Sequence, residues 1–249
     1  MKKSHLVYAI ALIVGMGACA ASAKKQAEAK PDVWKSYNVG TVLFEDKASE
    51  TKGSDIYHRI IPDAESYIKE QARTVLATLY NSPEDSITPV NKIHYTLEDI
   101  EGISAKGGGN GDVTIFYSTR HIEKSFAEND TAKLFFETRG VLLHELTHAY
   151  QLEPQGIGSY GTNRVFWAFI EGMADAVRVA NGGFDGPNAR PKGGNYMDGY
   201  RTAGYFFVWL RDNKDPEFLR KFNRSTLEVI PWSFDGAIKH ILGTEYSID

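Results

Sequence analysis

The sequence predicts an α+β fold, with a small sheet in the N-terminal half and a helical C-terminal half. Apolar and polar residues alternate along residues 93–97 and 113–117, which is typical of strands that bury one face. Apolar residues recur at helical spacing along residues 64–79 and in most of the chain after residue 131. We expect the helix at residues 64–79 to pack on the sheet.

The predicted elements begin with a strand at residues 39–44 and a polar loop around residues 52–54. The first helix starts at Pro62, because proline is favoured in the first helical turn. Further along, the glycine-rich residues 107–110 are predicted to form the turn between the two alternating strands.

A long helical pattern then runs from about Thr131 into the region of residue 150, with Gly140 as a possible break. It is followed by a glycine-rich loop at residues 154–162. The remaining helices are predicted at residues 166–178, with a stop near Asn181-Gly182-Gly183, and at residues 200–213, 215–224 and 232–242.

The first 23 residues have the layout of a secretory signal peptide, with two lysines, an apolar run too short to span a membrane, and small residues up to Ala23. The single cysteine, Cys19, follows Met16-Gly17-Ala18, which resembles a bacterial lipobox. Cleavage before Cys19 would give a lipid-anchored protein, whereas cleavage after Ala23 would give a soluble one, and we favour the anchor. Both routes predict an extracytoplasmic location, either periplasmic, at the cell surface or secreted.

Residues 24–35 are rich in Lys, Ala, Glu and Gln and are predicted to be a linker, and residues 36–249 to be a single domain. The formal net charge is −4, and it becomes −6 when the two lysines of the leader are removed. This acidic balance argues against nucleic acid as a partner. We expect a monomer whose only link to a membrane is the anchor at Cys19.

The chain is organised around His144-Glu145-x-x-His148, which lies in a helical pattern. Residues four apart on a helix project from one face, so the two imidazoles can share a metal ion. Zinc suits this pair, and Glu145 stands where the general base of a zinc peptidase is needed. The alternative is a solvated helix face. The leucines around the motif argue against it, because buried imidazoles without a partner are costly.

A following helix carries two acids four residues apart, Glu171 and Asp175. A catalytic zinc site needs three protein ligands, and we assign Glu171 as the third. Asp175 would accept the remaining imidazole N–H of a ligand histidine. The alternatives are that both acids face solvent, or that Asp175 pairs with Arg178.

Other kinds of site fit the sequence less well. In the extended pattern His-Glu-x-x-His-x-x-Gly-x-x-His the third histidine would fall at position 154, which is Pro154. No cysteine lies outside the leader, which excludes thiol ligands and thiol nucleophiles. The histidines at positions 58, 94, 121 and 240 stand singly, and we expect them to be surface or hydrogen-bonded residues.

Residues 144–151 and 171–178 resemble the two motifs of the basic secretory protein family, zinc metallopeptidases known from plants and bacteria, and the two acids are spaced as in thermolysin-like gluzincins. Weaker similarities occur at residues 93–105 and 200–203. The resemblance implies a zincin-like fold, in which a small twisted sheet lies beside the helix of the histidine motif. This chain departs from the family in three ways: it is acidic, residues 152–166 are longer, and members usually continue past position 249 for another helical turn or two.

These residues predict hydrolysis of a peptide or protein with one zinc ion on His144, His148 and Glu171. Glu145 would take a proton from water and deliver it to the leaving amine. Tyr200 is the candidate donor to the oxyanion, and the alternative, which we favour, is an ordinary core or surface tyrosine. Residues 113–117, if they form the sheet edge above the cleft, would pair with an extended peptide.

The alternative function is a surface lipoprotein that keeps the fold only to bind glycan or protein. The complete set of motif residues argues against it, because a protein that had lost catalysis would be free to change at least one of them. A purely structural metal site is a third interpretation, but it gives Glu145 no role. The sequence reveals neither the substrate nor whether an endopeptidase or an exopeptidase is present.

Overall fold

A four-stranded mixed sheet forms one side of the protein and carries helices on one face. The computed structural model describes residues 32–125, 130–184 and 189–248. The strands lie in the order β1 (Thr41–Asp46), β2 (Lys92–Glu98), β4 (Asp112–Ser118) and β3 (Ser104–Gly109). β1, β2 and β4 are parallel, whereas β3 runs antiparallel to β4 and forms an edge.

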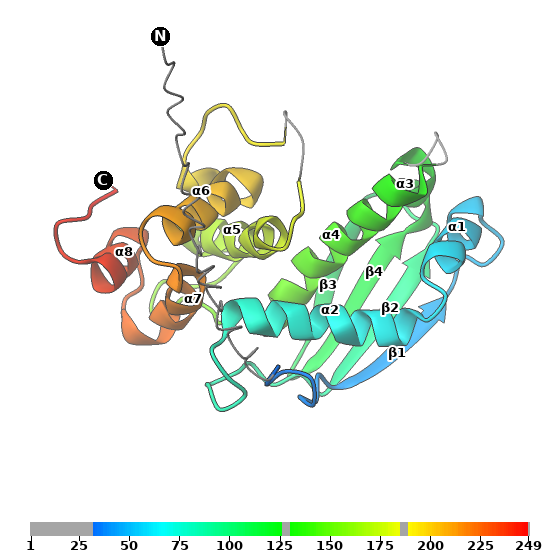
Figure 1. Ribbon diagram of the computed structural model, residues 1–249, viewed down its shortest axis with the longest axis horizontal. Helices are drawn as coiled ribbons and strands as arrows, with labels where there is room; N and C mark the ends of the chain where they lie inside the picture. Colours follow the sequence, from blue (N-terminus) through cyan, green and yellow to red (C-terminus); the bar gives the residue numbers. More distant parts are fainter. Residues whose placement is uncertain (1–31, 126–129, 185–188, 249) are drawn as a thin grey trace, which may run out of the picture. The chain divides into compact units, whose positions relative to one another are not determined.

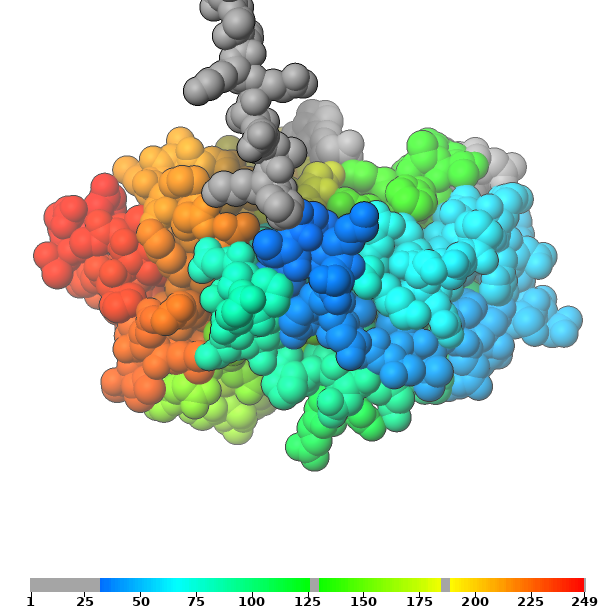
Figure 2. Space-filling view, turned by 60° about the horizontal axis from the view of Figure 1, so that its bottom comes forward, coloured from blue at the N-terminus to red at the C-terminus, as the bar shows by residue number. Residues whose placement is uncertain are grey.

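The helices are α1 (Lys52–Ile60), α2 (Ala64–Leu79), α3 (Thr119–Ser125), α4 (Thr131–Tyr150), α5 (Arg164–Ala180), the 3-10 turn η1 (Tyr196–Asp198), α6 (Tyr200–Asn213), α7 (Phe218–Glu228) and α8 (Phe234–Leu242). In Figure 1, α2 and α4 lie against the sheet, α1 and α3 lie near one end of its strands, and α5 to α8 lie past the other end. On the face seen in Figure 2, α2 (cyan) lies to the right, and α7 and α8 (orange to red) lie to the left. The predicted α+β class with a helical C-terminal half is confirmed.

Side chains alternate between the two faces of the sheet, and the apolar ones lie on the face that is buried. The buried side chains are Val42, Ile93, Tyr95, Leu97, Val113, Ile115 and Tyr117. On the other face Leu43 is 45% exposed and Thr114 is also exposed. Since α2 contacts β1 and α4 contacts β3, the helix that carries the histidine motif lies beside the edge formed by β3.

The long helix α4 runs through Gly140 without a break, contrary to the possibility raised by the sequence. Asp130 caps its first turn by accepting a hydrogen bond from the backbone N–H of Lys133 at 3.0 Å. Gly140 has another role. A Cβ at this position would lie 2.4 Å from Nε of Arg178, so the glycine makes room for the arginine of α5.

Three of the sequence predictions near the sheet are wrong. Residues 52–54 begin α1, where Thr51 caps the helix by accepting from the N–H of Ser54. Residues 107–109 belong to β3, and the turn is Asn110-Gly111, with φ of 53° and 83°. Such a pair with positive φ is typical of a two-residue hairpin. Residues 113–117 lie in β4, inside the sheet, so they are not the edge that an extended peptide could use.

Most other elements agree with their predictions within a few residues, and α6 has the predicted bounds. α3 and η1 were not predicted, and α7 begins and ends later than expected, at Phe218–Glu228. From Val33 onward the chain forms one compact unit. The predicted leader, Cys19 and most of the predicted linker lie outside the described residues. Within residues 32–125, 130–184 and 189–248, no helix is both long enough and apolar enough to cross a membrane.

Candidate metal centre

Two helices bring three candidate ligands together. α4 and α5 are in contact, and His144 and His148 of α4 face Glu171 of α5. The two Nε2 atoms lie 3.1 Å apart, and Oε2 of Glu171 lies 3.3 Å from Nε2 of His144 and 3.6 Å from Nε2 of His148. The structure therefore brings the three predicted metal ligands into one triangle.

The triangle fits a metal ion by size and by chemistry. Ligands about 2.0–2.1 Å from a tetrahedral zinc ion are roughly 3.3–3.4 Å from each other, close to the distances found here. Oε2 of Glu171 is buried and has no hydrogen-bond partner among the described residues. A buried carboxylate oxygen without a partner is costly, and a cation among these three atoms would supply the missing interaction. Two imidazoles and a carboxylate suit zinc.

Asp175 orients the first histidine. Its Oδ1 lies 2.7 Å from Nδ1 of His144, where the ring N–H donates and leaves Nε2 directed at the triangle. Burial by itself opposes a charge on this ring, but the hydrogen bond to Asp175 and the neighbouring carboxylate of Glu171 prevail and raise the pKa of His144 to about 10. Arg178 pairs instead with Glu137, its Nη2 lying 2.7 Å from Oε2. The alternative pairing of Asp175 with Arg178 is not present.

Gln151 contacts the second histidine, and the sequence analysis missed it. Its side-chain Nε2 lies 2.9 Å from Nδ1 of His148, while its Oε1 is buried and has no partner in the described part of the chain. The side-chain amide can be rotated by half a turn, which exchanges its oxygen and nitrogen and leaves its shape almost unchanged. Turned in this way, Oε1 accepts the Nδ1–H of His148. The available signal was its position, three residues after His148 at the end of the same helix.

Glu171 also has a partner that the sequence did not reveal. The hydroxyl of Tyr160 donates to Oε1 of Glu171 at 2.6 Å, from the irregular segment between α4 and α5. Burial by itself raises the pKa of Glu171, but the two neighbouring imidazoles and the hydrogen bond from Tyr160 prevail and bring it below its usual range. Glu171 is thus ionised and has one oxygen fixed by a phenol and the other directed at the histidines.

Glu145 and Tyr200 lie beside the triangle. Glu145 is 6% exposed and lines the same cavity as the three ligands. The ring of Tyr200 stacks on His144 with centroids 6.0 Å apart and an interplanar angle of 16°, and its edge meets Trp167. Burial and the nearby acids, Glu171 first among them, raise the pKa of Tyr200. Its phenol therefore remains protonated and able to donate near neutral pH.

The cavity that contains these groups has a volume of about 870 Å³ and extends past the triangle in both directions along α4. Gln151, Glu153 and Tyr160 line it beyond His148, and Glu137 and Arg178 line it on the other side of His144. Ser104, Ala105 and Lys106, the first residues of the edge strand β3, also line the cavity.

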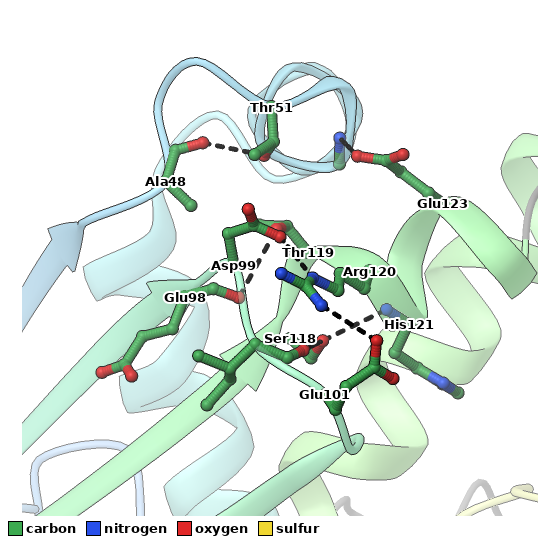
Figure 3. A network of polar contacts seen from close by, with 12 residues as sticks. Ala48, Thr51, Glu98, Asp99, Glu101, Ser118, Thr119, Arg120, His121 and Glu123 are labelled. Carbon is green, nitrogen blue, oxygen red and sulfur yellow. Dashed lines mark hydrogen bonds and ion pairs between the residues drawn. The ribbon is translucent and has the colours of Figure 1, made fainter.

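The start of β3 is held by a network of polar contacts (Figure 3). Arg120 of α3 donates from Nε to Asp99 at 2.7 Å and from Nη1 to Glu101 at 2.9 Å. Ser118 donates from its hydroxyl to the carbonyl of Ile100 and from its backbone N–H to the carbonyl of Ile103. These contacts fix the segment between β2 and β3, and with it the rim of the cavity.

The isolated histidines have ordinary partners, as the sequence suggested. His58, His94, His121 and His240 each lie 2.9–3.3 Å from one carboxylate, those of Asp46, Glu45, Glu137 and Glu228 respectively. Among the described residues, the group of His144, His148 and Glu171 is the one arrangement of three such side chains suited to a metal.

A comparison with known families agrees with the geometry. Residues 39–248 match the model of a family described as peptidase of plants and bacteria. The match covers both helices that carry the candidate ligands as well as the sheet. No curated protein and no solved structure matches the chain.

Proposed function

The chain belongs to the family of plant and bacterial peptidases, which confirms the predicted resemblance, and on this premise we propose that it is a zinc metallopeptidase. The observation that carries the proposal is the triangle of His144, His148 and Glu171, in which a buried carboxylate oxygen lacks a partner. Two oriented imidazoles and one ionised carboxylate are the ligand set of a catalytic zinc site with one open position.

A zinc ion held by these residues would act as a Lewis acid that polarises the scissile carbonyl and makes water more acidic. The protein's part is to keep the ligand atoms in place. Asp175 directs Nε2 of His144, and the turned amide of Gln151 does the same for His148. Tyr160 fixes the carboxylate of Glu171 from the opposite side.

Glu145 is the proposed general base. It follows a ligand histidine directly, is buried in the cavity wall, and is not one of the three ligands. In the proposed reaction its carboxylate takes a proton from the attacking water and then delivers it to the nitrogen of the leaving amine. Two phenols also line the cavity, those of Tyr160 and Tyr200. We assign Tyr200 as the donor to the oxyanion, because Tyr160 is already engaged with Glu171.

The substrate would bind as an extended peptide along β3. This strand pairs with β4 on one side only, and its first residues line the cavity. A peptide backbone could use its free N–H and C=O groups by adding a strand. β3 thus takes the role that the sequence analysis gave to residues 113–117.

We further propose an extracytoplasmic monomer, anchored through Cys19 or released after Ala23. The layout of the first 23 residues and the formal charge support this proposal. Mass spectrometry of the mature N-terminus distinguishes the two routes, since only a lipid-modified Cys19 carries the added acyl mass.

The proposed function is tested by metal content together with peptide hydrolysis. We expect about one zinc per chain, loss of hydrolysis on chelation, and recovery when zinc is restored.

Glu145→Gln should retain the metal and lose roughly 10²–10⁴-fold in rate, the usual range for general acid–base catalysis. Glu70→Gln, at an exposed position of α2, is the matched control. A zinc-loaded Glu145→Gln protein with full activity would refute the base. Zinc binding by the unaltered protein without cleavage of any peptide would favour the surface binding protein.

A further inference from the structure

Arg178 is held rigidly at the end of the cavity near the first half of α4. Its guanidinium carbon lies 3.8 Å from the centroid of the Phe184 ring. The other side of the guanidinium fits against α4 at Gly140, where any Cβ would overlap it. Tyr205 in turn donates to the backbone carbonyl of Phe184 at 2.6 Å. A planar cation is therefore fixed on the cavity wall, about two turns along α5 from Glu171.

Among the described residues that line it, this end of the cavity carries more positive than negative charge. The guanidinium of Arg201, which directly follows Tyr200, lies 5.4 Å from the same Phe184 ring. Lys106 lines the wall from β3, and among the described residues neither Lys106 nor Arg201 takes part in an ion pair. Among the described residues, the acid that pairs with a cation at this end is Glu137, and it is shared between Arg178 and His121. Arg201 and Lys106 therefore keep their charges without an acidic partner in the described part of the chain.

Resting on the proposed peptidase function, we propose that Arg178 and Arg201 form a subsite that binds a carboxylate of the substrate next to the scissile bond. Arg178 is 6% exposed; its Nη2 donates to Glu137, and its Nε is buried against Gly140 without a partner in the described part of the chain. The donors on Nη1 therefore remain for a carboxylate in the cavity. Arg201 is exposed and free to close over a bound acid. Guanidinium groups are well suited to a carboxylate because of their planar set of donors.

The carboxylate has two possible sources within a peptide. It can be the side chain of an internal Asp or Glu, which makes the protein an endopeptidase with an acidic preference. It can also be the α-carboxylate at the C-terminus, which makes it a carboxypeptidase. The same pair of cations would serve both, and substrates that differ only in this group separate them.

The test uses the zinc-loaded protein and matched fluorogenic peptides. One series replaces Gln by Glu at each position on either side of the cleaved bond, and a second compares free and amidated C-termini. We expect a preference of about tenfold in kcat/KM for the carboxylate at one position, a moderate value for a partly exposed charge contact. Arg201→Gln should reduce this preference several-fold and Arg201→Glu should reverse it. Arg211→Gln, on the same helix but outside the cavity, is the control.

A binding measurement keeps this inference separate from the proposed function. Fluorescence anisotropy of the same peptides with the non-cleaving Glu145→Gln protein reports the carboxylate preference without turnover. Arg178→Gln would leave a cavity at Gly140, so its binding result is used only if its thermal unfolding is unchanged. If it is destabilised, the test rests on Arg201→Glu. Equal binding of Glu and Gln peptides, or a preference that Arg201→Glu leaves intact, overturns the subsite. Absence of cleavage with a retained preference overturns only the peptidase function.

Discussion

Polar side chains serve different purposes at the candidate metal centre and at the rim of the cavity, which residues 99–103 form. At the centre, the side chains of Glu171 and Asp175 are each 5% exposed and are held between two helices. At the rim, Glu101 is 71% exposed and Arg120 is 44% exposed, and their contacts fix a loop (Figure 3). An unmatched polar atom is costly only where water is excluded. The buried oxygen of Glu171 is therefore a sign of function, whereas the exposed ion pairs serve to hold geometry.

Removing a ligand should have the largest effect. His148→Ala deletes one corner of the triangle, and we expect zinc affinity to fall by more than the 10–100-fold typical of changes to outer partners. Competition with a chelating dye measures this loss, and thermal unfolding should no longer respond to added zinc. His94→Ala, which removes a partly exposed histidine paired with Glu45, is the control. An unchanged zinc affinity in His148→Ala would mean that the triangle is not the metal site.

Zinc affinity should also depend steeply on pH. Because the pKa of His144 is raised to about 10 in the absence of metal, its ring holds a proton near neutral pH that binding must displace. Affinity should therefore rise by up to about tenfold per pH unit between pH 7 and 9, and the gain from this group should end near pH 10. Asp175→Asn removes the main stabilising partner of the proton and should flatten this dependence. A zinc affinity that is constant from pH 7 to 9 would contradict the prediction.

The partner of His148 offers a sharper test of the centre. Gln151→Leu removes the proposed acceptor of the Nδ1–H, and we expect zinc affinity to fall about 10–100-fold. Gln151→Glu restores an acceptor at the same place and should retain the affinity. If both variants bind zinc equally weakly, the amide acts by packing and not by orienting the imidazole.

The sequence was most informative where function depends on neighbours along one helix. The spacing of His144 and His148 alone puts both rings on one face, and the spacing of Glu171 and Asp175 does the same on α5. The contact between α4 and α5 then brings the histidine pair next to the pair of acids. Local periodicity was therefore enough to bring together the three candidate ligands and the partner of His144.

The parts that were missed depend on distant contacts. Tyr160 meets Glu171 from an irregular segment that has no periodicity to read. Gly140 looked like a break because its packing against Arg178 is not visible in the sequence. The prediction of a turn at residues 107–110 hides the strand β3, whose glycines pair with β4 at the edge of the sheet. Asn110-Gly111 is the stronger hairpin signal. Strand order is set by the whole sheet and not by any one segment.

A substitution at Gly140 probes the contact between the centre's two helices. Alanine is the better helix former by about 1 kcal/mol, yet its Cβ would overlap the guanidinium of Arg178. We expect Gly140→Ala to lower the free energy of unfolding by about 1–3 kcal/mol, the usual range for overpacking. Denaturant unfolding measures the change. Gly161→Ala is the control, since a Cβ there meets nothing within 4 Å. A stabilised Gly140→Ala protein would show that Arg178 moves aside freely.

The smallest effect on stability is expected at the rim. Arg120→Ala removes the ion pairs to Asp99 and Glu101, and exposed pairs contribute about 0–1 kcal/mol to the free energy of unfolding. Zinc affinity should not change, because none of these residues touches the triangle. The hydrogen bonds from the hydroxyl and the backbone N–H of Ser118 would still hold the carbonyls of Ile100 and Ile103.

Arg120→Ala also tests whether the rim acts on the substrate. If β3 binds the peptide, a looser start of the strand should raise KM a few-fold while leaving kcat and zinc content unchanged, because binding along the strand precedes the chemical step. Arg224→Ala removes another largely exposed ion pair, on α7 and outside the cavity, and should change neither constant. A loss of more than about 2 kcal/mol in Arg120→Ala would break the comparison, since it would make the exposed network as important for stability as a buried contact.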